Sequence, residues 1–259
     1  MKHVVMFSGG ICSWAAARRV SEKHGTADLI LLFADTKIED EDSYRFLEEG
    51  AKDVGGELVR IADGRDPWQV FKDVRFLGNS RLDPCSRVLK RDLCDKWMRD
   101  HFKPDECRVY LGLDWTEIHR AERAAGRWMP YTAESPMCDK PYMTKMQMIA
   151  SLATRGIKPP RLYAMGFSHA NCGGFCIKAG HGHFATLLRE LPARYRYHEG
   201  KEQELREHLG ADVSILKDRT GGVAKPMTLK TLRERIEARG EVDMFDIGGC
   251  GCFNDEEDK

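Results

Sequence analysis

The sequence lacks the features of a membrane protein, a secreted protein or a strongly basic protein. No run reaches the roughly 18 apolar residues that a membrane span requires, and the N-terminus has no basic segment followed by a secretory apolar stretch. Lysine plus arginine and aspartate plus glutamate balance at 41 each, so no overall electrostatic field attracts nucleic acid. We therefore expect a soluble, cytoplasmic protein without a membrane partner.

Cysteine, in contrast, is abundant. The 259 residues include nine cysteines, several of them clustered. In an intracellular protein such clusters indicate metal or redox chemistry more than a disulfide framework. A chain of this length can bury a large core, either as one α/β domain or as a domain with a smaller appendage.

The first stretch of the chain predicts a binding loop for an anion. An apolar run of strand length, residues 3–7, meets the turn Ser8-Gly9-Gly10, and a strong helix former follows Ser13. Free N–H groups of the first helical turn and the positive end of the helix dipole would point at a phosphate in this loop. No Gly-Lys-Ser/Thr follows, so this is not a Walker loop. The alternative is a purely structural turn made of small residues.

The next segments alternate between strand and helix. Residues 28–34 form a nearly continuous apolar strand, residues 39–54 have helical spacing, and a short strand follows at 58–61. This order predicts an α/β fold with a doubly wound, mostly parallel sheet that binds ligands at the carboxyl ends of its strands. Asp35 and Thr36 fall at such an end and are candidates for a nucleotide site, although Asp35 could equally cap the following turn.

A second motif places a cysteine at the entrance of a helix. The sequence predicts a helix that starts beside Cys85 and runs towards His101. The helix dipole and three neighbouring basic residues would lower the pKa of the Cys85 thiol, which favours the thiolate needed for metal ligation or nucleophilic attack. Cys94 and Cys107 have no partner at ligand spacing, and we expect them to be buried as small hydrophobic residues.

A third motif, Cys172-Gly-Gly-Phe-Cys176, has the form of a short chelating turn. Its glycines permit positive φ, and its backbone N–H groups can bind sulfur. Zinc usually takes four protein ligands, whereas an iron–sulfur cluster can use three cysteines, and Cys85, Cys172 and Cys176 make three. Cys138 is a spare metal-ligand candidate. Unligated thiols are the alternative.

Three histidines flank this pair of cysteines. His169, His181 and His183 could supply a nitrogen ligand. The last two fit better as the start of the next helix or as contacts to a substrate phosphate.

A proline-rich connector at 130–141 divides the chain into two expected units. Residues 1–140 would form the nucleotide-binding α/β domain, and residues 141–259 a cysteine-containing, mainly helical region packed on it. The basic loop at 217–226 could approach an anionic substrate or a nucleic acid backbone, or could be an ordinary solvated surface.

The chain ends in Cys250-Gly-Cys252 and an acidic tail. This motif is too short to bind zinc alone but suits a redox pair, a persulfide carrier or additional cluster ligands. Cys250 and Cys252 are therefore candidate catalytic residues.

Taken together, these motifs resemble the ATP pyrophosphatase (PP-loop) superfamily, and within it the branch similar to phosphoadenosine phosphosulfate (PAPS) reductases and to DNA phosphorothioation and tRNA thiolation sulfurtransferases. The loop Ser8 to Ser13 resembles the superfamily's pyrophosphate loop, with Cys12 where Asp is usual. Asp35-Thr36 matches an Asp-Thr at a comparable place, and residues 85–90 resemble a Cys-Thr-x-x-Leu-Lys stretch. Gly112, Glu117 and a following arginine resemble a Gly-x-x-x-x-Glu-x-x-x-Arg element, although a solvated helix face also explains them.

The resemblance implies an adenine nucleotide alpha hydrolase-like fold and one of three functions. The first is an ATP-dependent, adenylating sulfurtransferase that uses an iron–sulfur cluster, of the 4Fe–4S type, with Mg²⁺, and acts on a nucleic acid or nucleotide acceptor. The second is a PAPS reductase that releases sulfite with a thioredoxin-type reductant. The third is a non-catalytic module that binds zinc and a nucleotide. A sulfur donor would be needed for the first, and a homodimer is compatible with each.

Overall fold

The central element is a five-stranded parallel sheet. The computed structural model describes residues 1–79, 82–219, 222–240 and 242–248 of the chain. The strands are β1 (Lys2–Met6), β2 (Leu29–Ala34), β3 (Glu57–Ile61), β4 (Cys107–Tyr110) and β5 (Thr132–Glu134). They lie in the order β3-β2-β1-β4-β5, and every neighbouring pair is parallel. The predicted doubly wound α/β sheet is confirmed.

The strand order reverses between β1 and β4, so a crevice forms at their carboxyl ends. Val4 pairs with Ile30 of β2 on one side and with Val109 of β4 on the other. All three side chains are buried, because helices cover both faces of the sheet. This burial explains why β1 and β2 are apolar without alternation.

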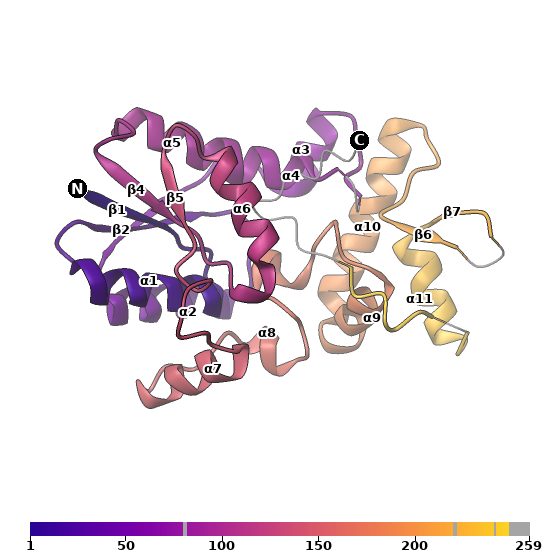
Figure 1. Ribbon diagram of the computed structural model, residues 1–259. Helices are drawn as coiled ribbons and strands as arrows, with labels where there is room; N and C mark the ends of the chain where they lie inside the picture. The colour runs from indigo at the N-terminus through magenta and orange to yellow at the C-terminus, as the bar shows by residue number, and fades with distance from the viewer. Residues whose placement is uncertain (80–81, 220–221, 241, 249–259) are drawn as a thin grey trace.

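Helices cover both faces of the sheet (Figure 1). One face packs against α1 (Ile11–His24), α2 (Glu41–Val54) and α7 (Lys145–Thr154). The other packs against α5 (Leu93–His101) and α6 (Ile118–Arg127). Cys94 and Cys107 belong to this second layer and are 1% and 2% exposed, which confirms the expectation that they are buried.

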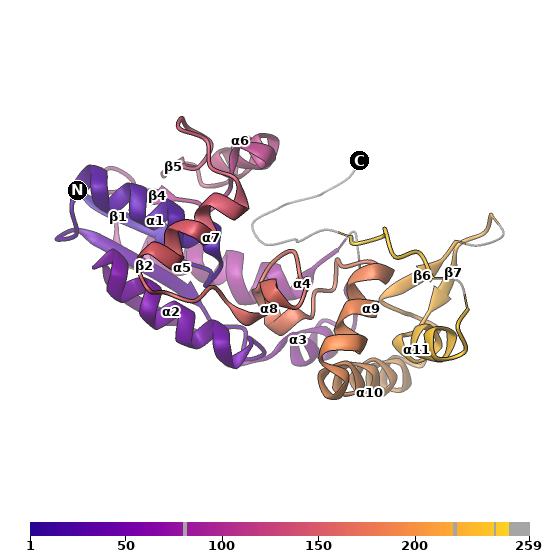
Figure 2. The ribbon, with the colours of Figure 1, turned by 90° about the horizontal axis from the view of Figure 1, so that it is seen from below.

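A second hydrophobic core lies at the other end of the molecule, as Figure 2 shows from below. Its helices are α3 (Pro67–Asp73), α8 (Arg161–Ala164), α9 (His181–Glu190), α10 (Pro192–Leu209) and α11 (Leu229–Glu237). The strands β6 (Leu216–Asp218) and β7 (Lys225–Met227) form an antiparallel hairpin. The sequence predicted only a loop at 217–226, which overlaps both strands. No helix among the described residues is long and apolar enough to span a bilayer.

Each core also includes a helix that comes from the part of the sequence that mainly forms the other core. α7 packs on the sheet through Met148 and Leu152, and α3 contributes Trp68 and Phe71 to the second core. Both helices begin with a capping box, at Thr144 and Asp66 respectively. The division at residue 140 that we expect from the sequence stays a prediction.

The helix predicted to begin at Cys85 is interrupted by a wider turn. It runs through α4 (Pro84–Ser86), the π-helical segment η1 (Arg87–Asp92) and α5. A π-helical turn shifts the register of the side chains that follow. Lys90 and Arg91 lie in it and are 5% and 4% exposed, so two of the basic residues that follow Cys85 are buried.

Candidate functional site

The loop between β1 and α1 has the geometry of an anion site. Gly10 is the N-cap of α1 and has no side chain to satisfy the first N–H groups, while Gly9 has φ +76°. The Ser13 hydroxyl donates to the Gly10 carbonyl at 2.8 Å, and the Ser8 hydroxyl donates to Ser13 Oγ at 3.3 Å. These bonds support the conformation of the loop at the positive end of α1, where the Ile11 N–H donates to the Tyr163 hydroxyl at 3.4 Å.

The loop after β4 packs tightly against this turn. A Cβ on Gly112 would lie 2.5 Å from Ser13 Cα and 2.7 Å from Ser13 N. Only glycine lets the two loops approach so closely. Gly112 therefore fixes the width of the crevice between β1 and β4, which is the topological switch point of the sheet.

A pocket of about 370 Å³, which we call the nucleotide pocket, opens at this crevice. Its polar walls come from the first loop, the loop after β4, α7, α8 and the segment before Cys172. The lining residues used below are Ser8, Gly10, Cys12, Ser13, Asp114, Glu117, Arg120, Lys145, Tyr163, His169, Asn171, Ile247 and Gly248. Three of the residues predicted for the phosphate loop, Ser8, Gly10 and Ser13, line it, and Gly9 shapes it.

The charges in the nucleotide pocket are of both signs. Arg120 forms an ion pair with Glu117, and Lys145 Nζ donates to the Ser168 carbonyl at 2.6 Å. Asp114 caps the short 3-10 helix η2 (Trp115–Glu117) by accepting from the Thr116 N–H at 2.9 Å. Such a set can balance the charge of a phosphate ester.

Cys12, which stands where the resembled superfamily has Asp, is a neutral thiol. Burial, and then the charge of Asp114, raises the pKa of Cys12 to about 12. A protonated thiol does not replace a carboxylate as a ligand of a hard cation such as Mg²⁺. The carboxylates among the lining residues of the pocket are Asp114 and Glu117.

His169 is the histidine of the nucleotide pocket. Burial, and then the charge of His183, lowers the pKa of His169 to about 3, so the ring is neutral. The two rings stack with centroids 5.5 Å apart, and His169 Nδ1 has no hydrogen-bond partner among the described residues. His183 Nε2 lies 2.7 Å from the Gly174 carbonyl oxygen. His181 is the first residue of α9, as predicted, and its Nε2 lies 3.1 Å from the Lys217 carbonyl oxygen.

The two residues predicted at the end of β2 point to different places. Asp35 accepts from the Lys37 N–H at 2.8 Å and from Tyr44 at 2.8 Å, so it holds the turn that follows β2. Burial raises the pKa of Asp35, but these bonds outweigh it and lower the pKa overall. The Thr36 hydroxyl donates to Glu39 at 3.0 Å, and Thr36 lines a second, smaller cavity.

That second cavity, which we call the thiol cavity, has a volume of about 30 Å³. It brings together the three cysteines that the sequence singled out, Cys85 from α4 and Cys172 and Cys176 from the segment before α9. Two lysines, Lys90 and Lys178, also line it. Cys138 lies elsewhere, with its thiol 3.6 Å from the Leu113 carbonyl and its pKa raised by burial.

The backbone at Cys172 is left-handed over three residues. Cys172, Gly173 and Gly174 have φ of 53°, 62° and 82°. Gly173 packs so closely that a Cβ would lie 2.5 Å from the Ile38 carbonyl. Any residue other than glycine at 173 would therefore clash with the Ile38 carbonyl and displace the turn, which explains the glycine at this position between the two cysteines.

A buried ion pair supports the wall of the thiol cavity. Lys90 Nζ lies 3.5 Å from Glu39 Oε1 and 3.7 Å from Cys172 Sγ, and the Glu39 carboxylate also accepts from the Cys172 N–H. The side chains of Lys90 and Glu39 are 6% and 2% exposed. Removing either charge would take a close partner of opposite charge from a buried group, so the network holds Cys172 firmly.

The thiol cavity gathers the three cysteines but is not a preformed cluster site. Its volume of about 30 Å³ is roughly that of one water, and the carboxylate of Asp83 stands in its wall together with the two lysines. Within the described residues, no group of three or more Cys, His, Asp or Glu side chains converges closely enough to hold a metal ion.

One short segment separates the two cavities. His169 and Asn171 line the nucleotide pocket, and Cys172 and Cys176 line the thiol cavity. A group bound in one cavity would therefore lie across a single stretch of chain from a group bound in the other.

The candidate catalytic residues Cys250 and Cys252 lie outside the described residues. The described chain before them crosses the start of α9, where the Gly182 N–H donates to the Asp246 carbonyl at 2.8 Å. Ile247 and Gly248 then line the nucleotide pocket.

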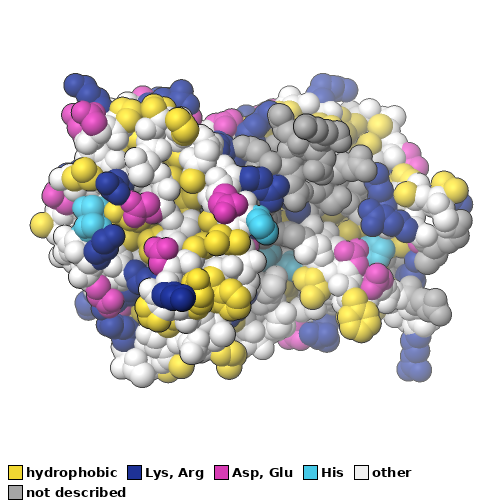
Figure 3. Space-filling model, viewed as in Figure 1, with side chains coloured by type: hydrophobic (Ala, Val, Ile, Leu, Met, Phe, Trp, Pro, Cys, Tyr) yellow, Lys and Arg dark blue, Asp and Glu magenta, His cyan; other side chains and the backbone are white. Residues whose placement is uncertain are grey.

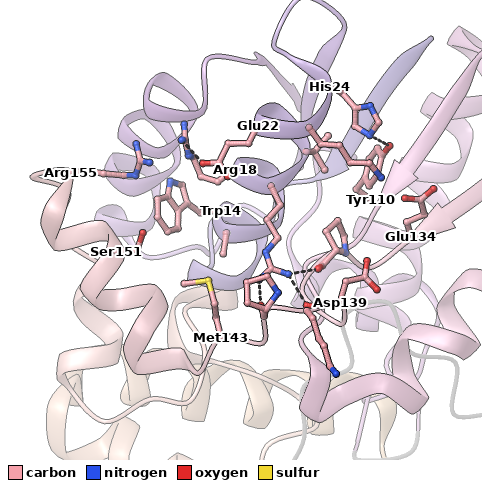
Figure 4. A pocket seen from close by; sticks show the side chains of 17 residues that line it. Trp14, Arg18, Glu22, His24, Tyr110, Glu134, Asp139, Met143, Ser151 and Arg155 are labelled. Carbon is pink, nitrogen blue, oxygen red and sulfur yellow. Dashed lines mark hydrogen bonds and ion pairs between the residues drawn. The ribbon is translucent and has the colours of Figure 1, made fainter.

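A third pocket, of about 580 Å³, lies along α1 on the flank of the sheet (Figure 4). Arg19 crosses it and donates to the carbonyls of Pro136 at 2.7 Å and Asp139 at 2.9 Å, which holds the connector that follows β5. His24 and Tyr110 lie at its far end in Figure 4. It is separate from the crevice at the carboxyl ends of β1 and β4, and no motif in the sequence predicted it.

Several residues of the two cavities were not predicted from the sequence. Glu39, Asp114, Lys145, Tyr163 and Lys178 line or support them. Each comes from a different loop or helix, and none belongs to a recognisable motif. Only an alignment of related sequences could have singled them out.

The comparisons with known proteins show similarity of fold only. No protein-family model matches the chain, and no curated protein matches its sequence. Among solved structures, it is similar to the crystal structure of phosphoadenylyl-sulfate (PAPS) reductase from Candida auris in a phosphate complex. The identity is 14%, the match covers 64% of this chain and 78% of that chain, and the TM-score is 0.44. With these values the likeness is a coarse one of fold, and no residue role passes from that enzyme to this chain.

Proposed function

We propose that this protein is an adenine-nucleotide-dependent enzyme of sulfur transfer, with the nucleotide in the pocket at the β1–β4 crevice and sulfur chemistry at the thiol cavity. The observation that carries the proposal is the shared wall, in which His169 and Asn171 line one cavity and Cys172 and Cys176 line the other. The motif resemblance supports the same assignment. An enzyme that activates with a nucleotide and then transfers sulfur needs these two groups side by side.

The phosphate loop and its neighbours would carry the activation step. An oxygen of a nucleic acid or nucleotide acceptor attacks the α-phosphorus of ATP, the bond to the bridging oxygen breaks, and pyrophosphate leaves. The N–H groups at the start of α1 and the side chains of Arg120 and Lys145 would stabilise the charge on the pyrophosphate. If Mg²⁺ takes part, Asp114 and Glu117 are the carboxylates available to it, since Cys12 is a neutral thiol.

The thiol cavity would carry the sulfur. Cys85, Cys172 and Cys176 would hold an iron–sulfur cluster, of the 4Fe–4S type, which would supply a binding position for sulfide when present. A sulfide-level sulfur from the donor then displaces AMP from the activated acceptor, so the carbon–oxygen or phosphorus–oxygen bond breaks as the bond to sulfur forms. This substitution involves no change of oxidation state, and a persulfide donor would require a thiol reductant in addition.

A PAPS reductase activity is the second candidate, and the position of the described C-terminal segment favours it. Ile247 and Gly248 line the nucleotide pocket, and Cys250 follows two residues later in the sequence. In that reaction a thiolate of Cys250 or Cys252 attacks the sulfur of PAPS, adenosine 3′,5′-bisphosphate leaves, and a thioredoxin-type dithiol releases sulfite and forms a disulfide.

The decisive experiment is analysis of metal and acid-labile sulfide, with an absorption spectrum, on protein purified without oxygen. Wild type should carry iron and sulfide, and Cys172→Ser and Cys176→Ser should lose both. Cys94→Ser, which changes a buried cysteine of the sheet core, is the matched control and should keep them. Zinc without turnover would contradict the proposal and support a non-catalytic binding module.

Product analysis separates the two reactions. Release of pyrophosphate from ATP in the presence of an oligonucleotide supports the sulfurtransferase. Release of sulfite from PAPS with a thioredoxin-type reductant, abolished in a Cys250→Ser/Cys252→Ser double variant, supports the reductase.

A further inference from the structure

Two aromatic side chains lie exposed beside the nucleotide pocket. Trp115 is 40% and Tyr142 50% exposed, although rings of this size are usually more buried. Their centroids are 5.6 Å apart and their planes meet at 33°. Trp115 Nε1 donates to the Met143 carbonyl at 3.3 Å, which ties the indole to the chain that carries Tyr142.

The pair lies at the rim of the pocket. Trp115 stands between Asp114 and Glu117 in the sequence, and Tyr142 lies three residues before Lys145; all three of these neighbours line the nucleotide pocket. In Figure 3, hydrophobic side chains gather on the surface around the end of α6 that faces α7. A molecule that stacked on the rings would therefore extend towards bound nucleotide.

The charges beside the rings are balanced. Lys140 and Lys145 flank Tyr142 in the sequence, and no ion pair joins either of them to a carboxylate within the described part of the chain. The carboxylate of Glu117 is paired with Arg120, whereas Asp114 precedes Trp115 and Asp139 precedes Lys140. The rings would therefore contribute most of the binding.

We propose that Trp115 and Tyr142 form a stacking platform that binds a base of a single-stranded nucleic acid, and that this strand presents the acceptor atom to the nucleotide pocket. The inference rests on the proposed function, of which it specifies the acceptor. Unpaired bases stack on exposed aromatic rings, whereas the bases of a duplex are already stacked on one another. Lys140, two residues before Tyr142, can contact a phosphate beside such a base.

The test is the binding of a fluorescently labelled 12-nucleotide single strand, measured by anisotropy without ATP. Trp115→Ala and Tyr142→Ala should each weaken binding about 5-fold to 100-fold, the range for loss of one stacked base, and Trp115→Phe should restore most of it. Tyr197→Ala is the matched control, because Tyr197 is 46% exposed on α10, and it should bind as wild type does. Lys140→Ala should reduce the salt slope of log K by about 0.7.

Titration of the same variants with ATP alone separates this inference from the proposed function. Unchanged ATP affinity with weakened strand binding supports the platform. Weakened ATP affinity with unchanged strand binding would show that the rings hold the adenine of the nucleotide, and would overturn it. So would wild-type protein that binds ATP but no single strand, or that binds a duplex of the same sequence equally well. Strand binding without pyrophosphate release from ATP would contradict the proposed function and leave the platform intact.

Discussion

The nucleotide pocket and the thiol cavity differ in how the chain builds them. Several segments wall each of them, but the pocket is centred on one continuous stretch, from Ser8 to Ser13, at a place where the sheet topology creates a crevice. The thiol cavity has no such central loop, and four separate segments contribute Thr36, Pro67, Cys85 and Cys172. The loop depends on local backbone geometry, whereas the side chains of the cavity depend on buried interactions between the segments.

The electrostatic interactions differ in the same way. The Glu117–Arg120 pair of the pocket has side chains 32% and 21% exposed, so water screens it, while the Glu39–Lys90 pair of the cavity is almost fully buried. We expect changes at the cavity to cost more stability than changes at the pocket. The predictions below test that difference.

The largest effect should come from Glu39→Ala. The substitution leaves Lys90 buried without its carboxylate and removes the acceptor of the Cys172 N–H, so the free energy of unfolding should fall by about 3–5 kcal/mol. Urea unfolding measures the change. Glu48→Ala, which breaks the exposed pair with Arg60, is the control and should cost less than about 1 kcal/mol. Equal losses in the two variants would refute the claimed difference between cavity and surface.

Gly112→Ala should have the next largest effect, and should act on the nucleotide pocket. The added Cβ overlaps the backbone of Ser13, so we expect a loss of stability at the upper end of about 1–3 kcal/mol and a clear loss of nucleotide affinity. Thermal unfolding and ATP titration measure both. Gly126→Ala in α6 is the control, because a Cβ there meets nothing within 4 Å, and it should be neutral or slightly stabilising. Wild-type ATP affinity in Gly112→Ala would contradict the tight packing of the two loops.

His198, which packs beside the thiol cavity, should make the free energy of unfolding depend on pH. Its ring is 2% exposed, accepts from Trp68 Nε1 at 3.0 Å and stacks 3.8 Å from Phe175, a wall residue of the cavity. Burial, and then the charge of Arg194, lowers the pKa of His198 to about 3. The unfolded chain therefore binds the proton more readily below about pH 6.5, and stability falls as the pH falls.

Between pH 7.5 and pH 5, this group should account for a loss of about 2 kcal/mol in the free energy of unfolding. His198→Gln should remove that part of the pH dependence, as urea unfolding at the two pH values would show. His119→Gln changes a side chain that is 90% exposed and should leave the pH dependence as in wild type. The same pH dependence in wild type and His198→Gln would show that the buried ring does not control it.

The smallest effect should come from Ser13→Ala. It removes the hydrogen bond from Ser13 Oγ to the Gly10 carbonyl and the acceptor of Ser8, at a cost of about 0.5–1.5 kcal/mol in stability. ATP affinity should fall modestly, because the N–H groups at the start of α1 remain. Ser151→Ala, on α7 beside the third pocket, is the control and should leave ATP affinity unchanged. An unaltered ATP affinity in Ser13→Ala would place the phosphates elsewhere.

Much of the sheet half could be predicted from the sequence, because its signals are local. The apolar runs of β1 and β2 and the glycines after β1 indicate strand, turn and helix by themselves. Thr144 and Thr228 cap the starts of α7 and α11, which is a local signal of the same kind. The short hairpin β6–β7 was missed, because three-residue strands carry too little alternation to be distinguished from a loop.

The sequence by itself determined the parallel α/β sheet, the phosphate-type loop at its centre and the list of cysteines to consider. Only the tertiary structure decided which of these residues meet. It brings Cys85 together with Cys172 and Cys176, places Cys138 apart, turns Thr36 to the thiol cavity and buries Lys90 against Glu39. Backbone conformation follows from neighbours in the chain, whereas contacts between residues far apart in the sequence, such as Cys85 with Cys172 or Lys90 with Glu39, arise only from tertiary packing.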